Sequence, residues 1–228
     1  MRDDAPLPAA LASGLVFLAS GAVLVLEILG IRLLAPYVGL TLETTTTIIG
    51  TVLAGIAAGA ALGGLAADRM EPRRLLAELL IGGALLAIGI VPLVRTLGAA
   101  LAGGGDGAAL VITLVALFPS ATALSAVTPV VAKVQLRDLG VTGSVVGRLS
   151  GWATAGALVG TFATGFIVVP LLPTGVAVLA TGGVLLLAGV ALAVRHGARS
   201  RRAAAGMAAG ALVVAGATLA AGSPCDAE

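Results

Sequence analysis

Residues 11–35 read LASGLVFLASGAVLVLEILGIRLLA, an apolar run interrupted by two charged residues, Glu27 and Arg32. A helix that spans a bilayer needs roughly 20 mostly apolar residues, and this run exceeds that length. It is also longer than the roughly 7 to 15 residues of a signal-peptide core, and it continues to Pro36 without an obvious cleavage site. The stretch therefore predicts a transmembrane helix that the mature protein retains.

Six further stretches are long and apolar enough to span a membrane, or nearly so: 45–67, 75–94, 108–132, 144–169, 172–194 and 203–222. None shows the alternating pattern of about 10 residues that is typical of barrel strands. We therefore predict an all-α polytopic membrane helix bundle with about seven transmembrane helices. The first six form a domain over 11–194, and the seventh, over 203–222, is rich in Ala and Gly.

Composition excludes several classes of protein. Of 228 residues, 59% are hydrophobic and 11% are charged, so a water-soluble fold could not bury the apolar surface. Aromatic residues, at 3%, are too few for the stacking platforms of a nucleic-acid-binding protein. With one cysteine and one histidine in the chain, a disulfide framework and a Cys/His metal cluster are both excluded. We expect no metal, no cofactor and no nucleic-acid partner for this chain.

Basic residues predict the orientation in the membrane. Only Arg32 and Arg95 lie on one side of the predicted helices. The other side carries the remaining Lys and Arg residues: Arg2, Arg69, Arg73, Arg74, Lys133, Arg137, Arg148, Arg195, Arg199, Arg201 and Arg202. Because cytoplasmic loops are enriched in Lys and Arg, we predict a plasma-membrane protein with residues 1–10 and the basic loop 195–202 in the cytoplasm. Residues 223–228 then lie outside, provided that the seventh helix inserts.

A basic anchor is predicted at the cytoplasmic face. Its residues are Arg148, Arg195, Arg199, Arg201 and Arg202. They are expected to hold the inner ends of the helices, and for the run 195–202 the binding of anionic lipid is a further expectation. Glycines spaced by four predict close contacts between helices. These are Gly55, Gly59 and Gly63, then Gly156 and Gly160, and finally Gly206 and Gly210.

The loop after the second helix, residues 64–74, reads GLAADRMEPRR. It resembles the loop motif between helices two and three of the major facilitator superfamily. That resemblance implies that Asp68, Arg69, Arg73 and Arg74 latch neighbouring helices on the cytoplasmic face. The alternative is a plain positive-inside anchor, with Pro72 in the first turn of the next helix. Glu78 is expected to pair with Arg74, four residues before it.

Three segments together are similar to the membrane region of fused major-facilitator/spermidine synthases. They are LEILGIRLLAPYVG over 26–39, GLAADR over 64–69, and 147–170, which begins GRL and contains Trp152 where that family suggests an aromatic residue. The likeness implies that the first six helices form half of a major-facilitator fold. SPCDAE over 223–228 resembles the start of the junction to a C-terminal aminopropyltransferase domain, which would bind decarboxylated S-adenosylmethionine and a polyamine. No catalytic residue is carried over to this chain.

Glu27 is the main candidate for a site within the membrane. An ionised acid near a helix centre costs roughly 2.5 to 3.5 kcal/mol, so it needs a partner or a water-filled cavity. Arg32 lies about 140° round the helix and is a poor partner. Two interpretations remain open. Glu27, Thr44 and Thr45 form a site for a cation such as a polyamine, or Glu27 is protonated and bonded to the Thr44–Thr47 cluster.

Three functions compete. In the first, the chain is the membrane domain of a spermidine-synthase-like protein and holds a synthase domain. In the second, it is a half-size transporter of polyamines or other cations, which would have to form a homodimer. In the third, it is a scaffold in the lipid bilayer. Pro119 and Pro129 fall inside the fourth predicted helix. They either break it to line a substrate path or have a purely structural role.

Overall fold

The computed structural model describes residues 7–136 and 142–196. The seventh predicted helix over 203–222 and the junction over 223–228 lie outside this part of the chain. So do Arg2, Arg137, Arg199, Arg201 and Arg202.

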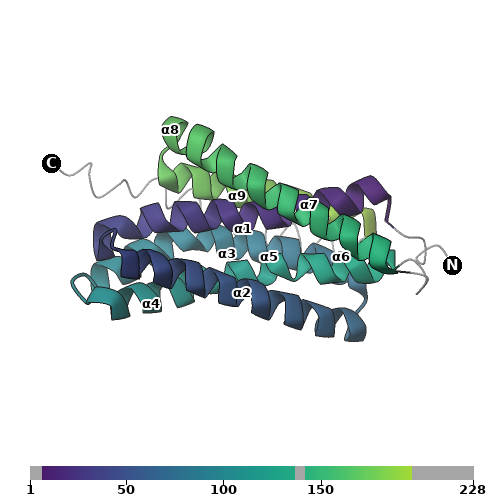
Figure 1. The fold of residues 1–228 in the computed structure, drawn as a ribbon, viewed down its shortest axis with the longest axis horizontal. Helices are drawn as coiled ribbons and strands as arrows, with labels where there is room; N and C mark the ends of the chain where they lie inside the picture. The colour runs from purple at the N-terminus through teal and green to yellow at the C-terminus, as the bar shows by residue number, and fades with distance from the viewer. Residues whose placement is uncertain (1–6, 137–141, 197–228) are drawn as a thin grey trace.

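The described chain is helical along almost its whole length (Figure 1). Its helices are α1 (Ala9–Val38), α2 (Leu42–Arg69), α3 (Pro72–Ala100), α4 (Gly105–Ala116), α5 (Phe118–Ser125), α6 (Val127–Gln135), α7 (Thr142–Ala163), the π-helix η2 (Thr164–Val168), α8 (Val169–Leu171) and α9 (Thr174–His196). Among the described residues, 6 helices are long and apolar enough to cross a membrane. The all-α polytopic bundle is confirmed, and the chain is an integral membrane protein.

Two of the six spans consist of several segments. The fourth span, Gly107–Gln135, contains most of α4 and all of α5 and α6, and the fifth, Thr142–Leu171, contains α7, η2 and α8. The fourth is interrupted at Leu117 and at Ala126. Each interruption lies within the four residues before Pro119 or Pro129. A proline interrupts a helix there because it has no N–H to donate and its ring crowds the carbonyl four residues earlier.

Three extensive contacts join α1 to the fifth span, α2 to the fourth, and α3 to α9, and α3 also packs extensively against the fourth span. The first span can be exchanged with the fourth, the second with the fifth and the third with the sixth. After this exchange, the same three pairs are obtained. The first and fourth spans also run in opposite directions (Figure 1). These three pairs are those expected of two inverted repeats of three helices. The contact of α3 with the fourth span departs from that pattern, because its counterpart between α1 and α9 is much smaller.

Glycines allow the closest of these contacts. In α2, a Cβ at Gly59 would overlap Thr122 of the fourth span, one at Gly63 would overlap Ala126, and one at Gly55 would crowd Ala121. In α7, a Cβ at Gly156 would overlap Phe17 of α1, and one at Gly160 would overlap Gly21. The packing role predicted for these two glycine sets is confirmed.

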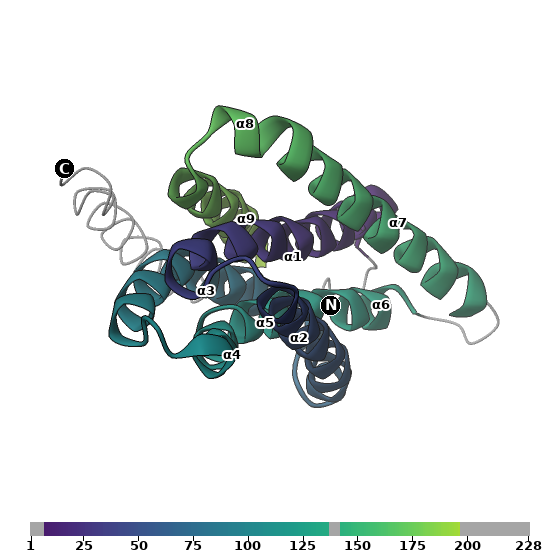
Figure 2. The ribbon, with the colours of Figure 1, turned by 60° about the vertical axis from the view of Figure 1, so that its left-hand side comes forward.

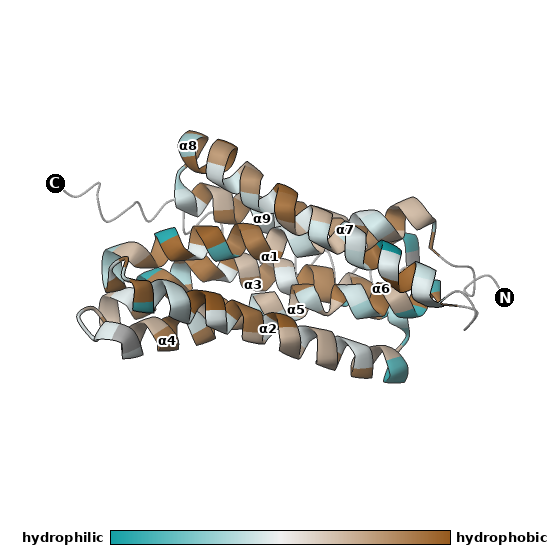
Figure 3. Ribbon diagram, viewed as in Figure 1, coloured by the Kyte–Doolittle hydropathy of each residue, from teal (hydrophilic) through white to brown (hydrophobic). Residues whose placement is uncertain are grey.

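Apolar side chains also cover the outside of the bundle. In Figure 3, the ribbons of α2 and α7 carry mainly hydrophobic or intermediate colours, and hydrophilic positions lie toward the ends of these helices. The fifth span lies at the edge of the bundle (Figure 2), and its outward residues include Leu158, Phe162 and Phe166, each more than half exposed. In a bilayer, this surface meets lipid chains and does not need to be buried.

Described basic residues gather at one end, the basic end, where α1 begins and α2 ends. Arg69, Arg73, Arg74, Lys133, Arg148 and Arg195 lie at or near it. Arg32 and Arg95 lie toward the other end, where α1 ends and α2 begins. The alternating directions of the helices thus produce the separation of charge that the sequence predicted.

Candidate functional site

Glu27 is buried in the interior of α1, with 9% of its surface exposed. Among residues 7–136 and 142–196, its carboxyl group has no hydrogen-bond or ion-pair partner. Uncompensated carboxylates are expensive in a low-dielectric environment. The sequence correctly placed this acid inside a spanning helix. Its carboxyl oxygens are not completely buried, since no fully buried side-chain oxygen of the described residues lacks a partner.

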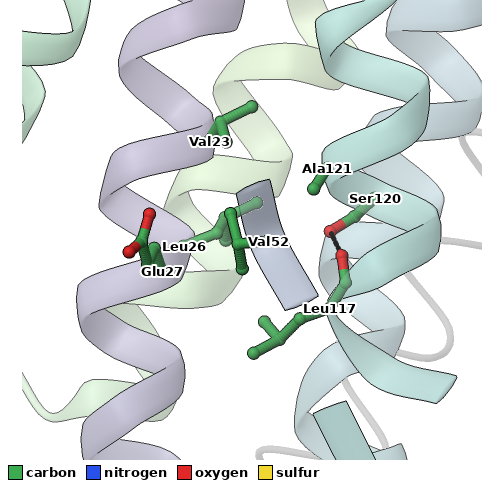
Figure 4. A pocket seen from close by; sticks show the side chains of 7 residues that line it. All are labelled: Val23, Leu26, Glu27, Val52, Leu117, Ser120 and Ala121. Atoms are coloured by element: carbon green, nitrogen blue, oxygen red, sulfur yellow. Dashed lines mark hydrogen bonds between the residues drawn. The ribbon is translucent and has the colours of Figure 1, made fainter. Parts of the chain in front are cut away.

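Glu27 lines a small pocket between three spans (Figure 4). Val23 and Leu26 of α1, Val52 of α2, and Leu117, Ser120 and Ala121 of the fourth span complete its wall. The space among these side chains is too narrow to hold a water molecule. The lining side chains therefore leave no room for a ligand among them in this conformation.

The break in the fourth span forms one wall of this pocket. Leu117 lies between α4 and α5, and its carbonyl accepts a hydrogen bond from the Ser120 hydroxyl at 3.1 Å. The Leu117 side chain also packs on Gly30 of α1, where no Cβ holds it away. In Figure 4, the Glu27 oxygens point away from Ser120. The carboxyl group and the Ser120 hydroxyl therefore do not face each other across the pocket, and its other walls are aliphatic.

Thr44 and Thr45 do not join Glu27. They lie in the first turn of α2, where Thr41 is the N-cap and accepts a hydrogen bond from the Thr44 N–H at 3.1 Å. The Thr45 hydroxyl donates to the Thr41 carbonyl at 2.9 Å. Val52 is the α2 residue beside Glu27, and Thr44 lies about 12 Å farther along the helix axis. Thr41 therefore caps α2, and Thr44 and Thr45 donate to it within the first turn, a role that the sequence interpretation missed.

The last turn of α2 is linked to α6 through charge. Asp68 accepts a hydrogen bond from Lys133 of α6 at 2.6 Å, and both side chains are more than half exposed. Lys133 was not predicted as a partner, although the sequence placed it on the same side of the membrane. The predicted pair of Arg74 with Glu78 is confirmed at 2.7 Å. Pro72 opens α3, as predicted.

The other basic residues of this region have different surroundings. Arg69 is exposed at the end of α2, and Arg73 is half-buried and engaged in an interaction. Arg148 and Arg195 are exposed near the basic end, where an anchor requires them. Trp152 of α7 packs edge-on against Phe17 of α1, with ring centroids 6.2 Å apart.

Exchanging Asp68 and Lys133 tests the contact between α2 and α6. Asp68→Lys should lower stability because it places two cations together, and Asp68→Lys combined with Lys133→Asp should restore it. An exposed pair is worth about 0.2 to 1 kcal/mol, so both effects should shrink in high salt. Thermal unfolding in detergent at two salt concentrations measures this. A double variant less stable than Asp68→Lys alone would contradict the pairing.

No protein-family model, curated protein or solved structure matches this chain.

Proposed function

We propose that this chain is the multi-pass membrane domain of a spermidine-synthase-like protein of the polyamine aminopropyltransferase family. In this proposal it lies in the plasma membrane with its N-terminus in the cytoplasm. A seventh helix over 203–222 leads to a synthase domain that follows Glu228 on the outer face. The first support is the resemblance of residues 26–39, 64–69 and 147–170 to such proteins.

The observation that carries the proposal is that each of these segments makes a contact between different spans. Gly30 of the first segment receives Leu117 of the fourth span. Asp68 of the second is paired with Lys133. Gly156 of the third lies against Phe17. The residues at contacts between helices depend on how the helices pack. A likeness at these positions therefore favours a related membrane domain over a chance likeness caused by similar amino-acid composition.

Two features of the fold are consistent with the proposal. The contacts of α1 with the fifth span, α2 with the fourth and α3 with α9 are those expected of half a major-facilitator fold. Such a half consists of two inverted three-helix repeats. The basic end carries most of the described Lys and Arg residues, which favours placing it in the cytoplasm.

Expression of the complete reading frame tests the proposal. We expect codons for a synthase domain after Glu228. The product should transfer an aminopropyl group from decarboxylated S-adenosylmethionine to 1,4-diaminobutane when both are supplied outside intact cells. A stop codon directly after Glu228 would overturn the synthase assignment. Activity that requires permeabilised cells would overturn the placement of the domain on the outer face.

A further inference from the structure

α2 and the fifth span are the least buried of the six spans. Within the most apolar stretch of each, 33% and 17% of the residues are buried, whereas the share is 44% or more in the other four spans. Both lie on the same side of α1 and the fourth span (Figures 1 and 2). α2 ends at the basic end and α7 begins there, so the two helices run in opposite directions. This side of the bundle, the α2–α7 side, is therefore incompletely packed.

Small residues form the outward faces of these two helices in the half nearer the basic end. The small-residue faces consist of Ala54, Ala57, Ala61 and Gly64 in α2 and of Gly143, Gly147, Ser150, Gly151 and Thr154 in α7. A Cβ at Gly64, Gly147 or Gly151 would meet nothing within 4 Å, in contrast to the glycines on the inner sides of the same helices. Glycine weakens a helix, and among the described residues no close contact at these three positions offsets that cost. Small residues on a membrane helix allow the backbone of another helix to approach.

The face of α1 on the α2–α7 side is polar. Ser13, Ser20 and Glu27 follow one another at seven-residue intervals, which places them within about 40° of one another round the helix. Phe17, which contacts α7, lies about 80° from Glu27 in one direction, and Gly30, which contacts the fourth span, lies about 60° from it in the other. The Glu27 carboxyl group points away from the fourth span (Figure 4). In the described part of the chain, none of the three polar side chains has a hydrogen-bond or ion-pair partner, and lipid chains cannot provide one.

We propose that the α2–α7 side binds a second copy of this chain. A two-fold axis along the membrane normal places α2 of each copy antiparallel to α7 of the other, and it keeps both basic ends on the same side of the membrane. Both small-residue faces are then covered, and the polar face of α1 lies inside the dimer. One further helix of the same chain, such as 203–222, could cover only one of the two faces. The dimer does not depend on the proposed function, because all its contacts lie within the described bundle.

Charges at the basic end complement each other in this arrangement. Asp68 continues the α2 face four residues beyond Gly64, and Lys133 pairs with only one of its carboxylate oxygens. Arg148 is exposed near the start of α7, and it has no ion-pair partner among residues 7–136 and 142–196. When the basic ends are level, Arg148 of one copy lies about 7.5 Å deeper in the membrane than Asp68 of the other, and a long arginine side chain extends toward the interface. Arg69 points about 100° away from Asp68 round α2.

Disulfide cross-linking in membranes tests which surfaces meet. In a Cys225→Ser background, one tagged chain carries Ala54→Cys, Ala57→Cys or Ala61→Cys, and a co-expressed chain with a different tag carries Thr154→Cys. Oxidation with copper phenanthroline should link the two chains, because a disulfide forms where Cβ atoms lie within about 4.5 Å. Ala180→Cys, at an exposed position of α9, is the control and should not link to Thr154→Cys. The proposal fails if none of the three α2 positions links, or if Ala180→Cys links equally well.

Counting copies in liposomes tests the small-residue faces themselves. The chain is labelled with a fluorophore at Pro8→Cys in the Cys225→Ser background, and photobleaching steps give the number of copies in each particle. Ala57→Leu and Gly151→Leu should each weaken dimer formation at least about tenfold, because leucine holds the two backbones apart. Ala180→Leu is the matched control and should associate as wild type, because Ala180 is exposed on α9.

Thermal unfolding in detergent verifies that each variant is folded. Gly151→Leu is the most informative variant, because one copy of the chain has space for the added side chain, so a loss of association does not reflect a damaged fold. Three results would overturn the proposal: a monomeric wild type in liposomes, unchanged association of the Ala57→Leu and Gly151→Leu variants, and an equal loss of association with Ala180→Leu.

Discussion

Replacing Gly156 with leucine should destabilise the bundle by about 3 kcal/mol or more, at or above the upper end of the usual cost of overpacking. A Cβ at this position already overlaps the carbonyl oxygen of Phe17, which belongs to helix backbone and cannot rotate away. The larger side chain must therefore separate α7 from α1. Because Trp152 packs on Phe17 at a ring-centroid distance of 6.2 Å, its fluorescence should change when the two helices part.

The same helix provides a matched control for this variant. Gly151 is exposed, and a Cβ built on it would meet nothing within 4 Å. Gly151→Leu should leave stability unchanged or slightly raised, since leucine favours a helix more than glycine does. The measurement is thermal unfolding in detergent followed by tryptophan fluorescence. Equal stability of the Gly156→Leu and Gly151→Leu variants would show that α1 and α7 are not in close contact.

Replacing Glu27 with leucine should have the opposite effect and stabilise the protein. Leucine matches the aliphatic walls of the pocket, and it removes a carboxyl group that has no partner among the described residues. An ionised acid at a helix centre costs roughly 2.5 to 3.5 kcal/mol on insertion scales. The protonated form costs less, so we expect a gain of about 1 to 3 kcal/mol.

Unfolding in increasing concentrations of a denaturing detergent measures this gain. Glu78→Leu is the control because Glu78 is exposed and forms only the surface pair with Arg74, so its loss should change stability by less than about 1 kcal/mol. Destabilisation of the Glu27→Leu variant by more than about 1 kcal/mol would mean that the acid has a structural partner. In that case Glu27 is retained for stability.

The sequence was sufficient to predict six of the helices because each spanning helix is specified by a local property, its apolar length. Contacts between neighbouring turns were predictable for the same reason. Arg74 and Glu78 are four residues apart on one helix, which places their side chains together without knowledge of the fold. The spaced glycines indicated that helices approach closely, but they did not indicate which helices.

Contacts between distant segments could not be predicted in this way. The pairing of Asp68 with Lys133 depends on α2 packing along the fourth span, which nothing within either segment determines. The same holds for the pocket, since Val52 and Ser120 reach Glu27 only through the arrangement of three spans. The sequence places Thr44, Thr45 and Glu27 toward the same side of the membrane, so the threonines were predicted to lie beside Glu27. In the structure, the hydroxyl groups of Thr44 and Thr45 are hydrogen-bonded within the first turn of α2.

Accessibility of single cysteines tests the central claim, that the described chain crosses the membrane with its basic end on one side and the opposite end on the other. A Cys225→Ser background removes the one cysteine of the chain. Single cysteines then replace Pro8 or Met70 at the basic end and Leu40, Ala102 or Leu172 at the opposite end, all exposed positions.

A membrane-impermeant maleimide applied to intact cells should label Leu40→Cys, Ala102→Cys and Leu172→Cys, and it should reach Pro8→Cys and Met70→Cys only after permeabilisation. That result requires the alternating helix directions of the structure. Labelling of both sets in intact cells, or of neither, would contradict the account.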